Sequence, residues 1–473
     1  ASGMSVGGSN FIIPYFYDIS NLPSRNSNNI NISSLQTNSA YYTADFSIKD
    51  FLVLSTTGRY DYYSSISSTV GPGIFTPSVS ASFIFSDLYH IEGLDFGKIR
   101  ISYAKTSAGA PAYANQVYYG VTNSINGTNA GNFSGQLPNL FLKPYQLTEL
   151  EIGTELKFFN DRLGLDVAYF SRKTKKEILN SSIDNSSGYT NAYVATGSTQ
   201  NNGLEIELHG TPVRTSSFSW TPSFNFTYVK NKVLATDAAG ANIGLGTYRP
   251  LNATTAFVVG LPGPQIMAND YKRDANGNII FDATGNAEAT ARVPLGSVVP
   301  KIYGGLNNEF SYKHFNLSFL VDYRFGNKVL SATNYYAIYR GLDKMTLPGR
   351  EGGVVGSGVN DAGSPNTVNV PAETYYQNLA RNISALNVLD GSFIKLRQVT
   401  FGYTFNRDWL NGTPFNSVTL SLVGRNLWTI MKHTDNIDPE SNFAPGINYA
   451  GIEGTSVPAV RTYGLNLNFK LKK

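Results

Sequence analysis

Residues near the end of the chain alternate strictly between apolar and polar or small side chains. The apolar positions are Tyr463, Leu465, Leu467, Phe469 and Leu471, and the positions between them carry Gly, Asn or Lys. A period of two places one set of side chains on each face of a β-strand. A soluble sheet and an outer-membrane barrel can both end in such a strand, so this stretch alone leaves the choice open.

The same alternation recurs along the chain and predicts an all-β fold of about thirteen antiparallel strands. In one predicted strand, Leu52 and Leu54 share a face with Tyr60 and Tyr62, while charged and hydroxyl side chains occupy the other face. The longest apolar face runs from residue 315 to residue 325. One strand changes parity between Leu396 and Val399, which predicts a β-bulge near Arg397–Gln398.

Alternation by itself does not tell which face meets water, since a soluble sandwich and a membrane barrel carry the same pattern turned inside out. Three features favour a transmembrane barrel. The predicted strands often reach ten residues, whereas soluble strands average five or six. Their polar faces carry many charged residues, which suits a wet lumen. Short links, such as those at 49–50 and 313–314, alternate with long ones, such as 231–300 and 331–391.

The composition agrees with a transmembrane barrel and argues against several other classes of protein. Charged residues make up only 15% of the 473 residues, while Tyr and Phe number 30 and 28. The net charge of +4 shows no clustering in sequence, so nothing predicts nucleic-acid binding. The chain has no cysteine, which excludes disulfides and thiol chemistry. No apolar run approaches the roughly 20 residues of a membrane-spanning helix.

Two runs of barrel-like alternation lie at 142–166 and 201–207. Short motifs lie at 58–61, 98–103, 390–397, 401–403, 424–427 and 438–440. In their order and spacing, these segments resemble the SusC/RagA-type TonB-dependent outer-membrane transporters. The resemblance covers essentially the whole chain, but only the later part of the family's sequence. One departure is that Phe469 is followed by four more residues, whereas family members commonly stop at the terminal aromatic.

The resemblance implies that residues 35–473 form the later ~13 strands of a 22-stranded barrel, with Tyr463, Leu465, Leu467 and Phe469 in the C-terminal barrel-assembly strand. Residues 1–34 are expected to be an extracellular loop segment. An open sheet edge in lipid would leave backbone groups unpaired at high cost. We therefore expect a further N-terminal segment to complete the barrel and to carry the plug.

By the same resemblance, the chain is expected to belong to a TonB-dependent active importer of oligosaccharides or oligopeptides in the Gram-negative outer membrane. The implied partners are a SusD-like lipoprotein lid, the TonB complex acting through the plug, and outer-membrane lipid. No enzymatic activity, cofactor or nucleic-acid partner is expected. The alternatives are a passive outer-membrane porin and a secreted carbohydrate-binding β-sandwich protein.

The sequence offers few candidates for catalytic or metal-binding residues. The four histidines, His90, His209, His314 and His433, are too scattered to predict a metal site or a catalytic triad. Carboxylate pairs such as Glu205 and Glu207 are what a charged lumen face contains, so no catalytic residue is assigned.

Acidic and amide residues between 270 and 282 hint at a calcium loop. However, Ile279 stands where an EF-hand loop requires glycine. Asn276–Gly277 between short apolar runs is better explained as a type I′ hairpin turn, and no metal is predicted.

Aromatic residues in the predicted loops are the candidate substrate contacts, because their rings can stack on sugars or peptides. Packing within the loops explains the same residues equally well. They are Tyr15, Tyr17, Tyr335, Tyr336, Tyr375 and Tyr376.

Overall fold

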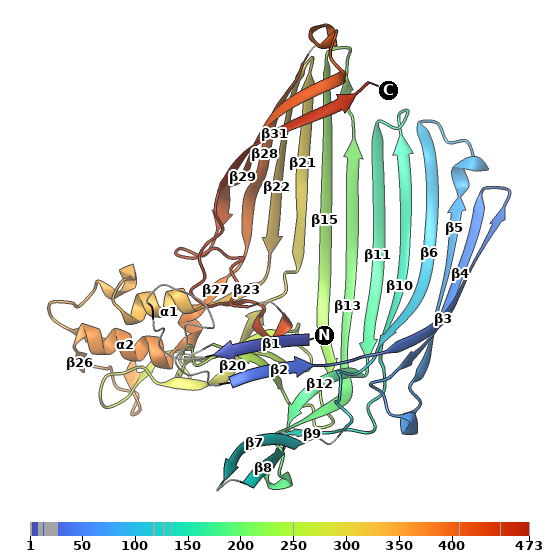
Figure 1. The fold of residues 1–473 in the computed structure, drawn as a ribbon. Helices are drawn as coiled ribbons and strands as arrows, with labels where there is room; N and C mark the ends of the chain where they lie inside the picture. The colour runs from blue at the N-terminus through green and yellow to red at the C-terminus, as the bar shows by residue number, and fades with distance from the viewer. Residues whose placement is uncertain are drawn as a thin grey trace.

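One large antiparallel sheet dominates the computed structural model. The structure describes residues 2–7, 13, 27–116, 119–125, 128–133, 135–248, 250–405, 407–444 and 446–472. In the described part of the chain, thirteen strands lie side by side in sequence order (Figure 1). They are β3 (Thr37–Ile48), β4 (Leu52–Tyr63), β5 (Gly73–Ile84), β6 (Leu94–Ala108), β10 (Tyr145–Phe158), β11 (Leu163–Lys175), β13 (Asn191–Gly210), β15 (Phe218–Ala235), β21 (Ile302–Tyr312), β22 (Phe315–Phe325), β28 (Phe393–Thr404), β29 (Phe415–Lys432) and β31 (Thr462–Leu471). The predicted strand number is confirmed.

Short turns and long loops are sorted to opposite ends of the sheet. The short connections lie at the upper end in Figure 1, together with the C-terminus, and the long loops lie at the lower end. Ile48 pairs with Leu52, so only residues 49–51 connect β3 to β4, and Lys49 and Asp50 turn the chain with positive φ angles of 42° and 61°. The long segments 236–301 and 326–392 connect β15 to β21 and β22 to β28. The predicted alternation of connection lengths is therefore confirmed.

The predicted parity change in β28 is also confirmed. Leu320 pairs with Gln398, while the next residue, Val321, pairs with Leu396. Arg397 is therefore the additional residue of a β-bulge, and the apolar faces of β22 and β28 stay aligned on both sides of it.

The long loops contain their own small elements. The loop 109–144 contains β7 (Tyr119–Ile125), β8 (Thr128–Phe133) and β9 (Gln136–Leu137), and the loop 176–190 contains β12 (Glu177–Ser182). Those of 236–301 are β16 (Ile243–Thr247), β17 (Thr254–Phe257), β18 (Gln265–Tyr271), β19 (Ile280–Phe281) and β20 (Ala289–Ser297). Those of 326–392 are β23 (Lys328–Ser331), α1 (Ala332–Tyr339), β24 (Val354–Val355), β25 (Val359–Asn360), β26 (Asn369–Val370), α2 (Ala372–Asn382) and β27 (Val388–Asp390). β30 (Ile452–Glu453) lies before the last strand, and β14 (Val213–Arg214) adds to the turn before β15.

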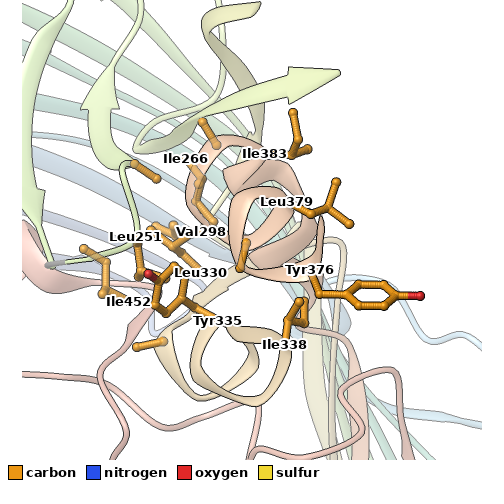
Figure 2. Close-up of a cluster of buried hydrophobic side chains, with 14 residues drawn as sticks. Leu251, Ile266, Val298, Leu330, Tyr335, Ile338, Tyr376, Leu379, Ile383 and Ile452 are labelled. Atoms are coloured by element: carbon orange, nitrogen blue, oxygen red, sulfur yellow. The ribbon is translucent and has the colours of Figure 1, made fainter. Parts of the chain in front are cut away.

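Three long loops pack around one hydrophobic core, which we call the loop platform (residues 236–301, 326–392 and 433–461). Leu251 and Ile266 come from the first loop, Leu330 and Ile383 from the second, and Ile452 from the third (Figure 2). All five side chains are fully buried. The platform is therefore folded in the manner of a soluble domain, although its three segments are separated by strands of the sheet.

Two expectations need correction. Residues 2–7 and 27–32 form the antiparallel strands β1 (Ser2–Gly7) and β2 (Ser27–Ile32), so the N-terminal segment is not loop throughout. At 274–278 a tight turn is present, but only Gly277 has a positive φ, of 86°, and a type I′ turn requires two such residues. Asp274 Oδ1 accepts the N–H groups of Asn276 and Asn278 instead, which stabilises an Asx-type turn. In the described residues, helices are too short and too polar to cross a membrane.

Candidate functional site

The two faces of the sheet differ in chemistry, and we call the apolar one the outer face and the polar one the inner face. Outer-face side chains are exposed: Ile101 by 47%, Ile152 by 46% and Leu422 by 56%. Leu317 of the longest apolar strand is 38% exposed. In the described residues, no second sheet covers this face, contrary to what a soluble sandwich requires. The apolar faces predicted to contact lipid are therefore open at the surface.

The inner face carries cross-strand ion pairs. Arg100 Nη1 and Nη2 contact the two carboxylate oxygens of Asp166 at 2.7 and 2.8 Å, and its Nε contacts Glu151 at 3.1 Å. Arg172 forms a second bidentate pair with Glu149, at 2.7 and 3.0 Å. Since such pairs need water or further polar groups around them, they fit a hydrated inner wall.

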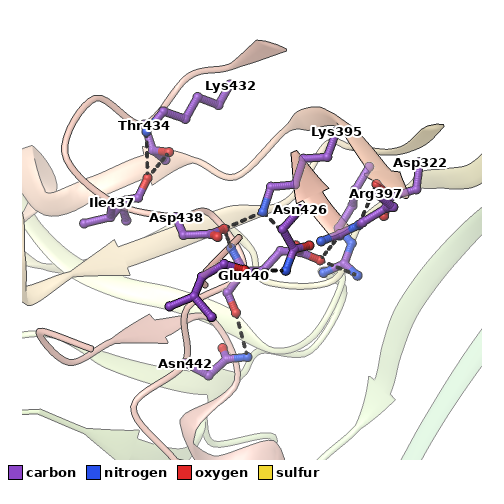
Figure 3. A network of polar contacts seen from close by, with 12 residues as sticks. Asp322, Lys395, Arg397, Asn426, Lys432, Thr434, Ile437, Asp438, Glu440 and Asn442 are labelled. Carbon is purple, nitrogen blue, oxygen red and sulfur yellow. Dashed lines mark hydrogen bonds and ion pairs between the residues drawn. The ribbon is translucent and has the colours of Figure 1, made fainter. Parts of the chain in front are cut away.

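A charge network joins the inner face to the loop platform. Lys395 of β28 is only 6% exposed, and its Nζ lies 2.6 Å from Asp438 Oδ1 and 2.7 Å from Glu440 Oε2 (Figure 3). Arg397, the bulge residue, contacts Glu440 at 2.5 Å and Asp322 of β22 at 2.8 Å. The sequence motifs at 390–397 and 438–440 thus meet at one place, although more than 40 residues separate their charged groups.

The electrostatics of this junction keep both loop carboxylates ionised. Burial raises the pKa of Asp438, but hydrogen bonds from Lys395 and from the backbone N–H of Glu440 bring it below its usual value. Burial raises the pKa of Glu440 as well, and the hydrogen bonds from Arg397 and Lys395 outweigh it. The network therefore fixes the loop at 433–461 to the wall of the sheet at neutral pH.

A buried carboxylate links two segments of the platform. Glu453 is fully buried, and its oxygens accept hydrogen bonds from Ser331 Oγ at 2.7 Å and from the backbone N–H of Thr333 at 3.0 Å. Ser331 Oγ in turn accepts the N–H of Asn334. A negative charge at the N-terminus of α1 is favourable, because the free N–H groups of the first turn point toward it.

The candidate aromatic residues occupy different environments. Tyr15 and Tyr17 lie outside the described residues. Tyr335 and Tyr376 lie in the platform core and are 4% and 7% exposed, which favours the packing role (Figure 2). Tyr375 packs partly buried against the core, and Tyr336 is 37% exposed. Substrate contact stays a prediction, and Tyr336 has the most accessible ring among the four described.

A cavity between the ends of α1 and α2 was not predicted from the sequence. Its volume is about 790 Å³, and its lining includes Tyr339, Arg340, Arg350, Glu373 and Gln377. Rings, guanidinium groups and amides around one concave surface can bind sugar hydroxyls or peptide groups. The sequence did not indicate this cavity, because the residues that line it come from both helices and from the loop between them.

The C-terminal strand remains accessible along its whole length. Tyr463, Leu465, Leu467 and Phe469 are each exposed by half or more, and within the part of the chain that the structure describes β31 pairs with β29 only. Among the same residues β3, at the opposite edge, pairs with a single strand, β4. A role of β31 in barrel assembly stays a prediction.

The architecture is that of part of an antiparallel β-barrel, and comparison with known proteins identifies the family. The model of the family described as TonB dependent receptor-like, beta-barrel matches residues 5–427, so the chain belongs to this family. TonB-dependent receptor P26 of Formosa agariphila is 29% identical to it, over 96% of this chain and 48% of the relative. TonB-dependent receptor SusC of Bacteroides thetaiotaomicron is 24% identical, over 71% of this chain and 33% of the relative.

Solved structures share the fold. The RagAB peptide transporter superposes with a TM-score of 0.76 at 18% identity, covering 99% of this chain and 52% of the matched chain. The resemblance to SusC/RagA-type proteins inferred from the sequence is confirmed. The chain spans about half the length of P26 and of the matched RagAB chain.

Proposed function

We propose that this chain forms the later part of the barrel of a TonB-dependent importer of oligosaccharides or oligopeptides in the Gram-negative outer membrane. The observation that carries the proposal is the pair of opposite faces. Ile101 and Leu422 represent an exposed apolar outer face, while Arg100 and Asp166 represent a charged inner face. A wall that is apolar outside and polar inside separates lipid from a water-filled passage.

The two open edges of the sheet support the proposal of an additional barrel segment. β3 and β31 each leave one row of backbone groups without a strand partner in the described chain, and such groups are costly in lipid. We propose that an N-terminal segment supplies the remaining strands and the plug, and that TonB acts on the plug. A SusD-like lipoprotein would cover the loop platform, and the complex would transport its ligand without covalent change.

The central experiment compares uptake with and without energy input. Cells producing the complete protein are given labelled oligosaccharides or oligopeptides too large for general porins, with and without TonB. Import that requires TonB supports the proposal. Equal uptake without TonB would indicate the passive porin, and conversion of the ligand by the purified protein would contradict a purely transporting role.

The proposed ligand contacts are tested separately. Replacing Tyr336 or the cavity residue Tyr339 with Ala is expected to weaken ligand binding by about 1–3 kcal/mol, the range for one lost stacking contact with its buried area. Ala in place of Leu342, which is 80% exposed and does not line the cavity, is the matched control. Equal affinities of all three variants would place the ligand elsewhere.

A further inference from the structure

Lysines form a row across the outer face near the end that carries the long loops. The register of four consecutive strand pairs places Lys105, Thr148, Lys173, Gln200 and Lys232 directly side by side on β6, β10, β11, β13 and β15. Cross-strand neighbours share a face. The three lysines, which we call the lysine row, therefore point to the same side of the sheet as the apolar residues that lie nearer the short turns.

Polarity changes sharply over two steps along these strands. The row four residues nearer the short turns is apolar and aromatic, and it consists of Ile101, Ile152, Tyr169, Leu204 and Tyr228. The intermediate row consists of Tyr103, Leu150, Ser171, Asn202 and Lys230. The exposed tyrosines Tyr103, Tyr169 and Tyr228 therefore lie two or four residues from the lysine row, at the border between apolar and charged positions, where a membrane interface favours aromatic residues.

Further positive charge gathers beside the lysine row. Burial lowers the pKa of Lys176, which follows β11, and repulsion from nearby Lys143, Lys105 and Lys175 lowers it further. These cations lie close enough to repel one another.

No carboxylate compensates the lysine row within the described residues. The lysine ion pairs there involve Lys98, Lys272, Lys328 and Lys395, none of which belongs to the row. Glu177 is near in sequence, but its Oε1 accepts hydrogen bonds from Thr174 and Thr199, which alternate onto the inner face. The outer face is thus left with unbalanced positive charge next to its apolar band.

We propose that the lysine row binds the phosphate groups of lipid headgroups in the outer leaflet. Lysines on alternate strands stand about 10 Å apart, so one phosphate can be shared between neighbours while the acyl chains cover Ile101, Ile152 and Leu204. The inference rests on the proposed placement in the outer membrane with the long loops outside. It adds a specific lipid-binding site to that placement.

The test uses the complete protein purified from outer membranes and titrated with bisphosphorylated lipid A, with affinity read by native mass spectrometry. The variant K105Q/K173Q/K232Q is expected to bind about 100-fold more weakly, at roughly fivefold for each lysine near an anionic lipid surface. The matched control K49Q/K313Q/K470Q removes the same charge at the short-turn end and is expected to bind as the unaltered protein does. Heat-modifiable migration in gels verifies that both variants are folded.

Three results would overturn the inference: equal affinities of the two triple variants, equal binding of dephosphorylated lipid A, or displacement of the lipid by millimolar inorganic phosphate. The last result would indicate a site for free anions. Absence of the protein from the outer-membrane fraction would overturn the proposed function, and this inference with it. Unchanged lipid binding by a correctly located row variant would defeat the inference alone.

Discussion

The outer face of the sheet and the core of the loop platform use the same kinds of side chain in opposite ways. Leu330 and Ile383 of the platform are fully buried, whereas Leu422 and Ile101 of the sheet are 56% and 47% exposed. Burial within the protein stabilises the platform by roughly 25 cal/mol for each Å² of apolar area removed from water. The apolar side chains of the outer face are removed from water, and so contribute to stability, only when an apolar medium surrounds the sheet. Apolar content alone therefore does not distinguish a protein core from a lipid contact; exposure does.

The largest expected effect is in the platform core. Leu330→Ala should destabilise the platform by about 2–5 kcal/mol, because the fully buried side chain leaves a cavity. Hydrogen exchange of α1 and α2 in the complete protein measures the loss. Leu422→Ala on the outer face is the matched control, and lipid or detergent can fill its space. Equal losses in the two variants would contradict the distinction between the regions.

A charge on the outer face should have the next largest effect. Ile101 lies midway along β6, so Ile101→Arg should cost about 2–4 kcal/mol of folding stability in lipid vesicles, as measured by urea titration. Its neighbour Ser102 belongs to the inner face, and Ser102→Arg should be tolerated there. If the inner-face substitution proved the more damaging of the two, the faces would have been assigned the wrong way round.

Substitutions at the junction between the sheet and the loop platform should have a smaller effect on stability. Lys395→Met removes two charge-assisted hydrogen bonds, to Asp438 and Glu440, and should loosen the loop at 433–461 by about 1.5–3 kcal/mol. Lys328→Met is the control, since Lys328 and Asp390 are 36% and 40% exposed and such surface pairs contribute about 1 kcal/mol at most. Local hydrogen exchange measures both, and similar values would mean that the network is not a structural anchor.

The smallest expected effect is a dependence of this junction on pH. Asp438 and Glu440 have lowered pKa values in the folded protein. Their contribution to stability is therefore complete above the unfolded-state pKa values of about 4 and is lost as the pH falls through the lower folded values. Exchange protection of 433–461 should decrease below about pH 4. The variant D438N/E440Q should show a flatter profile, and an unchanged profile would exclude these groups as the cause.

Much of the sheet could be predicted from the sequence, because strand formation depends on local alternation. The thirteen strands, the sorting of short and long connections and the bulge at Arg397 each follow from parity or from loop length within a few residues of the chain. The alternation did not determine which face is exposed, since both environments select the same period.

Contacts between distant segments were decided only by the tertiary structure. Ser331 and Glu453 are 122 residues apart, and no local pattern predicts that a buried carboxylate caps α1. The sequence left open whether Tyr335 packs within the loops or contacts a ligand, and its place in the core follows from the packing of three loops around it. The lysine row likewise depends on register: Lys105, Lys173 and Lys232 are scattered in sequence and become neighbours on one face only when the strands between them align.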